Sequence, residues 1–190
     1  MKGAHTTKEA SFLEVEPGKV EGEVRVPGSK SLTNRGLLIA ALAQGDSILR
    51  GALFSDDTHH MTSSLKVLGF QVEEFPEEER FVVRGGGGNI PVQRAKLFVG
   101  NAGTAMRFLT AFLCLGRGDF EIDGAERMRQ RPIQDLLDCL NQLGARVKSR
   151  LDNGCPPVII EAGGLEGGRA FMRGKLSSQY FTAVFLSAPY

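Results

Sequence analysis

The segment Val26–Arg35 carries the residues of this chain that are best suited to bind an anion. It ends a run of alternating valines, turns at a Pro-Gly pair and opens an apolar helix pattern over residues 37–42. A helix start presents unpaired backbone N–H groups and the positive end of the helix dipole. Four polar side chains stand at this start: Ser29, Lys30, Ser31 and Arg35. The segment therefore indicates an anion site, and an N-capped helix with two incidental cations is the alternative.

The chain repeats this arrangement along its length. Gly45-Asp46 recurs at Gly118-Asp119, 73 residues later, and Phe108 recurs at Phe181 with the same offset. Repeats of this length indicate supersecondary units that stack and share a core. A repeat that serves folding alone is the weaker alternative, because a small or polar turn precedes the first helix of every copy.

Each full copy is expected to fold as strand, helix, strand, helix, strand, strand. Leucines spaced three and four apart predict the helices, and short β-branched or alternating runs predict the strands. The expected elements are 23–26, 31–43, 48–49, 58–68, 71–74 and 81–83 in the first copy, and 96–99, 104–115, 120–122, 132–143, 146–148 and 158–160 in the second. We therefore predict an α/β (α+β) fold of repeated βαβαββ units, at about 20–88, 89–164 and 165–190, with the third unit incomplete.

The first helices of the three units are expected to begin on one surface. Their starting turns are Gly28-Ser29-Lys30-Ser31, then residues 100–104, then Ser177-Ser178-Gln179. Three converging helix dipoles with Lys30, Arg35 and Arg107 nearby would favour a ligand with several negative charges.

Composition narrows the class of protein. The chain has 190 residues, 42% of them hydrophobic, and its 23 Lys and Arg balance 22 Asp and Glu, which argues against a nucleic-acid partner. No apolar run is long enough for a membrane span, so no membrane partner is expected. The cysteines and histidines show no metal-ligand spacing, and Cys114 and Cys139 are expected to be buried thiols of a reducing compartment. A cytoplasmic location fits these features best.

Five motifs in order resemble the 5-enolpyruvylshikimate-3-phosphate (EPSP) synthase family. They are Pro27-Gly28-Ser29-Lys30-Ser31-x-x-Asn34-Arg35, Ser55-Asp56-Asp57, Gly100-Asn101-Ala102-Gly103-Thr104-Ala105-Met106-Arg107, Arg127-Met128-x-x-Arg131-Pro132-Ile133 and Ser177-Ser178-Gln179-Tyr180. The resemblance runs from about residue 13 to the last residue. The first motif is not a Walker A loop, because Ser29 stands where that loop has glycine.

The resemblance implies an enzyme, a 3-phosphoshikimate 1-carboxyvinyltransferase, with an inverse α/β barrel-like enolpyruvyl transferase fold. It would transfer the enolpyruvyl group of phosphoenolpyruvate to the 5-hydroxyl of shikimate 3-phosphate, which leads to chorismate and aromatic amino acids. It implies no metal or organic cofactor. The herbicide glyphosate, which the family binds at the phosphoenolpyruvate site, is implied as an inhibitor.

The resemblance also assigns roles to single residues. Lys30 is the expected catalytic residue and touches both substrates, while Ser31 and Arg35 lie on the shikimate side. The phosphoenolpyruvate side is matched by Asn101, Gly103 and Arg127. The phosphate and ring of shikimate 3-phosphate are matched by Ser177, Ser178 and Gln179. Asp56-Asp57 matches no substrate role and is expected to cap the second helix.

Two departures from the family qualify this assignment. Phe108 occupies a position where the family commonly has proline. The chain is also about half the size that two domains of three units need. The proton-transfer carboxylates are therefore expected in a C-terminal half, and a strand at residues 12–16, within the segment 1–19, is expected to belong to that second domain.

Four interpretations stay open at this point. The chain is either the N-terminal part of the synthase, inactive alone, or a non-catalytic fragment that binds shikimate 3-phosphate. The related UDP-N-acetylglucosamine enolpyruvyl transferase would show Lys-Asn in place of Lys30-Ser31 and a reactive loop cysteine. A scaffold repeat protein is disfavoured by the small polar residues at all three helix starts.

Overall fold

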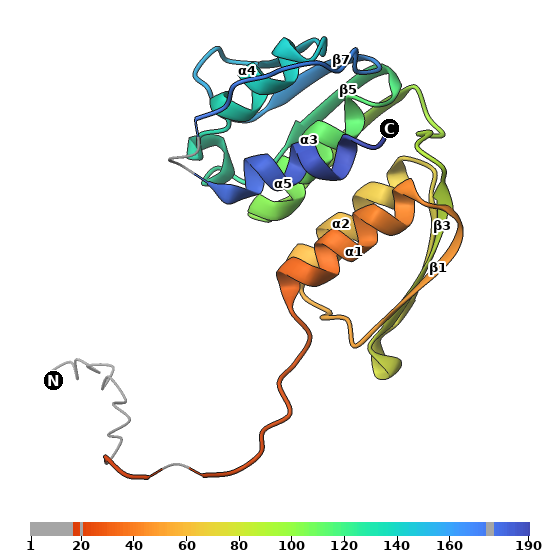
Figure 1. Ribbon diagram of the computed structural model, residues 1–190, viewed down its shortest axis with the longest axis vertical. Helices are drawn as coiled ribbons and strands as arrows, with labels where there is room; N and C mark the ends of the chain where they lie inside the picture. The colour runs from red at the N-terminus through yellow and green to blue at the C-terminus, as the bar shows by residue number, and fades with distance from the viewer. Residues whose placement is uncertain (1–16, 20, 174–176) are drawn as a thin grey trace, which may run out of the picture.

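The computed structural model describes residues 17–19, 21–173 and 177–190. In this part of the chain, helices cover two separate sheets that lie next to each other, and residues 17–19 and 21–24 extend away from them (Figure 1). The expected strand at residues 12–16 lies outside the described residues. None of the described helices has the length and apolar character needed to cross a membrane.

The first sheet has three antiparallel strands in the order β1-β3-β2. Its elements are α1 (Lys30–Leu42), β1 (Gln44–Arg50), α2 (Asp56–Val67), β2 (Gln71–Phe75) and β3 (Arg80–Gly86). Leu37, Leu38 and Leu65 of the helices are fully buried, together with Phe81 and Val83 of the central strand. This burial of apolar side chains fixes both helices on the sheet.

The second sheet has four strands in the order β4-β5-β7-β6, with β4 parallel to β5 and the other pairs antiparallel. Its elements are β4 (Arg94–Phe98), α3 (Gly103–Leu113), β5 (Arg117–Asp123), α4 (Gln134–Gln142), β6 (Val147–Ser149) and β7 (Val158–Gly163). A last helix, α5 (Ser178–Ser187), packs along α3. Every residue of α3 is buried, so this helix is the centre of the fold.

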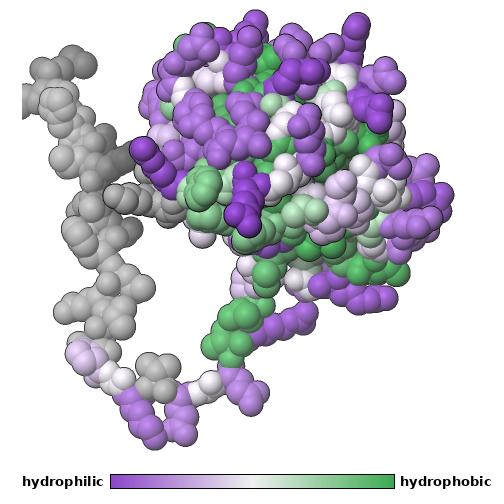
Figure 2. Space-filling view, turned by 45° about the horizontal axis from the view of Figure 1, so that its top comes forward, coloured by the Kyte–Doolittle hydropathy of each residue, from purple (hydrophilic) through white to green (hydrophobic). Residues whose placement is uncertain are grey.

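The predicted helices and strands are confirmed with shifts of a few residues at their ends, except for one. The second copy has the predicted order of strand, helix, strand, helix, strand, strand. The strand expected at residues 23–26 is wrong: this segment forms no strand, and Val24 and Val26 are 85% and 77% exposed. Figure 2 shows the segment leaving the body with hydrophobic surface on it. A strand needs a hydrogen-bonded neighbour, and alternating valines do not supply one.

Two glycines let backbone segments approach closely enough to set the start and end of α1. A Cβ on Gly28 would collide with the carbonyl oxygen of Gly51, which ties the turn before α1 to the end of β1. A Cβ on Gly85 would collide with the carbonyl oxygens of Ala40 and Ala43 in the last turn of α1. Both obstacles are backbone atoms, so neither can move away alone.

We predict that Gly85→Ala destabilises the fold by roughly 3 kcal/mol, because overpacking against backbone forces the helix off the sheet. Gly163→Ala is the matched control, since the nearest atom to its added Cβ is the end of the Arg146 side chain at 4.0 Å. Chemical denaturation of both variants measures the difference. Equal stability of the two variants would show that the contact between α1 and β3 is loose.

Candidate anion-binding site at the helix starts

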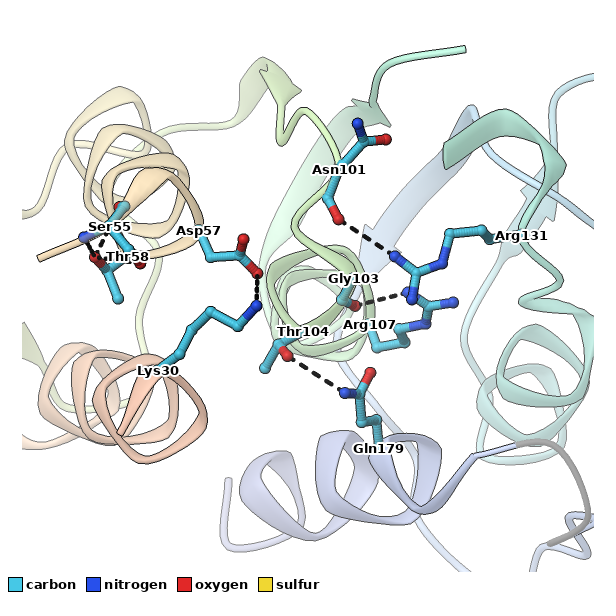
Figure 3. A network of polar contacts seen from close by, with 10 residues as sticks. All are labelled: Lys30, Ser55, Asp57, Thr58, Asn101, Gly103, Thr104, Arg107, Arg131 and Gln179. Carbon is cyan, nitrogen blue, oxygen red and sulfur yellow. Dashed lines mark hydrogen bonds and ion pairs between the residues drawn. The ribbon is translucent and has the colours of Figure 1, made fainter. Parts of the chain in front are cut away.

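The starts of α1 and α2 are joined by an ion pair. Lys30 is the first residue of α1, and its Nζ lies 3.2 Å from Oδ2 of Asp57 in the first turn of α2. Its side chain remains 50% exposed, so it is free to meet a ligand as well. Ser55 occupies the N-cap of α2 and forms a capping box with Thr58, so the expected cap by Asp56-Asp57 is wrong. Asp57 is instead the partner of Lys30 (Figure 3).

The start of α3 is surrounded by two arginines. The guanidinium of Arg107 donates to the carbonyl oxygen of Gly103 at 2.9 Å, and that of Arg131 donates to the carbonyl oxygen of Asn101 at 3.2 Å. A Cβ on Gly103 would lie 2.5 Å from Nη1 of Arg107 and 2.6 Å from both Nη atoms of Arg131. The two guanidinium groups can therefore lie here only because residue 103 has no side chain (Figure 3).

Arg107 is a buried cation without a countercharge. Its side chain belongs to a residue that is 5% exposed, and its Nε has no hydrogen-bond partner in the described part of the chain. Burial lowers its pKa from the usual value, and the charge of Arg131 lowers that pKa further. Within the same described residues, neither arginine forms an ion pair with a carboxylate. Two adjacent guanidinium groups in this state favour a bound anion, and their forked donors suit carboxylate or phosphate.

The start of α5 reaches the same turn. The side-chain nitrogen of Gln179 donates to the hydroxyl of Thr104 at 3.3 Å. The hydroxyl of Ser177 caps α5 by accepting from the backbone N–H of Gln179 at 3.2 Å, while Ser178 is exposed. Polar groups from α3, α5 and the loop before α4 thus surround the first turn of α3 (Figure 3).

The residues of the first motif that the sequence assigns to a shikimate side lie along α1. Ser31 follows Lys30 in the first turn, and its backbone oxygen accepts from the guanidinium of Arg35 at 3.0 Å. Arg35 also lies over the ring of Phe108 in α3, with its Cζ 5.3 Å from the ring centroid. Arg35 therefore joins α1 to α3 through its contact with Phe108.

Arg127 and Arg131 occupy different surroundings although only four residues separate them. Arg127 is exposed and precedes the short 3₁₀ turn Met128–Gln130. The hydrogen bond to the turn before α3 comes from Arg131. Sequence comparison by motif selected Arg127 for the phosphoenolpyruvate side and left Arg131 as an unassigned cation. The sequence signal for the position of Arg131 was the proline that follows it before α4, because a residue before proline is held in an extended conformation.

The described residues place no cluster of metal ligands at these helix starts, and two of the three thiols are buried. Within the described residues, no group of three or more His, Cys, Asp or Glu side chains is placed to hold a metal ion. Cys114 and Cys139 are buried, as the sequence predicts, and burial raises the pKa of the Cys114 thiol to about 12. A thiol with that pKa is protonated at neutral pH and is a poor nucleophile.

Comparison with known proteins decides the family. The model of EPSP synthase (3-phosphoshikimate 1-carboxyvinyltransferase) matches residues 15–190. The chain belongs to the EPSP synthase family. It is 48% identical over 193 aligned residues to the chloroplastic 3-phosphoshikimate 1-carboxyvinyltransferase of Petunia hybrida, with 97% of this chain and 37% of that protein covered. It is 52% identical over 167 aligned residues to the enzyme of Pseudomonas savastanoi pv. phaseolicola, with 87% and 39% covered.

The fold agrees with this family. The EPSP synthase structure from Acinetobacter baumannii superposes with a TM-score of 0.79 at 27% sequence identity, over 87% of this chain and 38% of that one. The chain therefore spans less than half the length of the EPSP synthases that it matches. The same comparisons support the α/β fold class predicted from the sequence.

We predict that Arg131→Ala weakens binding of phosphoenolpyruvate to this chain by about tenfold or more, because it removes a charge-assisted, forked contact. Arg127→Ala, four residues away in the same loop, is the matched control and is expected to change the dissociation constant less than about threefold, since an exposed cation is screened by solvent. Titration in the presence of shikimate 3-phosphate, followed by NMR chemical shifts, measures both. If Arg127→Ala weakens binding more than Arg131→Ala does, then Arg127, the residue selected by motif, makes the contact with the anion.

Proposed function

We propose that this chain supplies the shikimate-phosphate side of an enolpyruvyl transferase active site. The proposed reaction transfers the enolpyruvyl group of phosphoenolpyruvate to the 5-hydroxyl of shikimate 3-phosphate and releases inorganic phosphate. The observation that carries the proposal is the uncompensated pair of guanidinium groups, Arg107 and Arg131, at the Gly103 turn of an EPSP synthase family member. Both proposed substrates are polyanions, and preorganised cations stabilise such ligands and the charge that develops as they react.

The chemistry proceeds by addition and elimination. The methylene carbon of phosphoenolpyruvate takes up a proton, the 5-hydroxyl oxygen bonds to the adjacent cationic carbon and loses its proton, and the C–O bond to phosphate then breaks as a proton leaves the methyl group. General acids and bases of suitable position carry these protons. Carboxylates for this role are proposed to lie in the remaining length of the protein, which this chain does not cover.

The proposed roles of the residues follow their places around the site. Lys30 contacts both substrates from the start of α1, and Arg35 grips the shikimate carboxylate beside Ser31. Asn101 and Gly103 face phosphoenolpyruvate, with Arg131 beside Gly103 as the main cation and the exposed Arg127 as an outer cation that contributes little. Ser177, Ser178 and Gln179 hold the phosphate and the ring of shikimate 3-phosphate from the start of α5.

The first motif favours this reaction over the transfer to UDP-N-acetylglucosamine, because that related enzyme is expected to have Lys-Asn where this chain has Lys30-Ser31. Of the three cysteines, Cys114 and Cys139 are buried, whereas Cys155 is partly buried in the loop between β6 and β7. A fragment that binds shikimate 3-phosphate without chemistry is the second candidate, favoured by the coverage of less than half of the relatives.

Two further partners and one location complete the proposal. The C-terminal half is the proposed partner for catalysis, and glyphosate is a proposed inhibitor that occupies the phosphoenolpyruvate side. The names of the plant relatives place those enzymes in chloroplasts. For this chain a cytoplasmic location stays a prediction from its sequence.

We predict that this chain alone binds shikimate 3-phosphate weakly and releases no phosphate from a mixture of both substrates. Proton transfer contributes typically about 10²–10⁴-fold to such reactions, so the missing carboxylates should abolish measurable turnover. NMR titration measures binding, and a phosphate-release assay measures turnover. Addition of the C-terminal part of the Pseudomonas savastanoi relative as a separate chain is expected to restore phosphate release. A folded chain that shows no shift with millimolar shikimate 3-phosphate would remove the proposed function.

We further predict that Lys30→Ala weakens shikimate 3-phosphate binding by about tenfold or more, because a charge-assisted contact of one cation with an anionic ligand is lost. Lys66→Ala is the matched control, since Lys66 also forms an ion pair, with Glu74, but at the other end of α2. In the Lys66→Ala variant, the dissociation constant for shikimate 3-phosphate should change less than about twofold. If the two variants bind equally well, Lys30 is only a surface charge at a helix start.

A further inference from the structure

Phe108 lies directly beneath the cation that the proposed site uses on the shikimate side. It is fully buried in the middle of α3, and the Cζ atom of Arg35 lies 5.3 Å from its ring centroid. This distance falls within the range over which a guanidinium is attracted to the face of an aromatic ring. Phe108 therefore contacts α1 through Arg35 as well as the apolar core.

Arg35 is held on two sides, and neither contact neutralises its charge. Its Nη1 donates to the carbonyl oxygen of Ser31 at 3.0 Å, one turn earlier in α1. The ring of Phe108 provides the second contact. Arg35 has no ion pair with a carboxylate in the described ranges 17–19, 21–173 and 177–190. A long, flexible side chain is thus ordered while its charge stays available for a ligand.

We propose that Phe108 is a positioning residue that holds the Arg35 guanidinium ready for the carboxylate of the sugar-like substrate. The inference rests on the proposed function, because it concerns the ligand that Arg35 binds there. A bound carboxylate would take the in-plane donors of the guanidinium, while its flat face stays on the ring. Fixing the cation before the ligand arrives reduces the entropy lost on binding.

The sequence context makes this contact specific to the residue type at position 108. A leucine or methionine would fill the buried space but offers no π-face to a cation. Position 108 lies five residues after Gly103 on the same helix, and its ring contacts the cation on α1.

The test separates positioning from packing by using a second buried phenylalanine of the same helix. Phe112 is also fully buried in α3 and contacts the ring of Phe70 at a centroid distance of 5.8 Å, and no cation–π contact is found for it in the described residues. Phe112→Leu therefore matches Phe108→Leu in lost volume and in lost aromatic contact. Denaturation of both variants checks that their stabilities are similar.

The expected result is a selective loss of shikimate 3-phosphate binding, measured by NMR titration of the full chain. Phe108→Leu should raise the dissociation constant about three- to tenfold, the factor that corresponds to roughly 0.7–1.4 kcal/mol for ordering one flexible side chain on binding. Phe112→Leu should change it less than about twofold. In an Arg35→Ala background, Phe108→Leu should have almost no further effect, because a residue that acts through Arg35 cannot act without it.

The outcomes that overturn the inference are distinct from those that overturn the proposed function. Equal effects of Phe108→Leu in the Arg35 and Arg35→Ala backgrounds, or equal effects of Phe108→Leu and Phe112→Leu, would show a packing role alone. A wild-type chain that binds no shikimate 3-phosphate would overturn the proposed function and this inference with it. Phe108→Met, a flexible apolar replacement, repeats the test if the leucine variant does not fold.

Discussion

The absence of a side chain at residue 103 is the constraint on which the candidate site depends. Without a Cβ there, the guanidinium groups of Arg107 and Arg131 both reach the first turn of α3. Each donates to a backbone carbonyl beside that turn, and no carboxylate in the described residues pairs with either one. The two guanidinium groups therefore hold positive charge at the positive end of the helix dipole. A bound anion would neutralise this charge.

Burial of α3 makes this arrangement rigid. All of its residues are buried among the second sheet, α5 and the helices α1 and α2, and Arg107 is buried with them. A charged group in such a place normally has a partner, because removal of a charge from water is costly. The lowered pKa of Arg107, caused first by burial and then by Arg131, expresses this cost. Binding of an anion would reduce this free-energy cost, so a bound ligand would stabilise the first turn of α3.

Contacts between elements that are far apart in the sequence assemble the rest of the site. Lys30 meets Asp57, Arg35 meets Phe108, and Gln179 meets Thr104 across 75 positions of the chain. Each pair joins two different helices, so the side chains are positioned by helix packing and not by local turns. This packing brings side chains from α1, α2, α3 and α5 together near the starts of these helices.

The sequence by itself determined the helices and strands, because apolar spacing and glycine stops are local signals that later contacts did not override. It also determined the motifs at the helix starts and, through them, the family. Its error at residues 23–26 has a simple cause, since alternation marks residues that suit a strand but gives no information about a neighbouring strand.

Only the tertiary structure decided which cations share a site. Arg127 and Arg131 belong to one motif, yet the loop before α4 places Arg131 at the turn of α3 and leaves Arg127 exposed. Likewise, Asp57 was expected to cap its own helix, while the packing of α1 against α2 made it the partner of Lys30. Such pairings depend on the angles at which helices pack, and a linear pattern of residues carries no information about those angles.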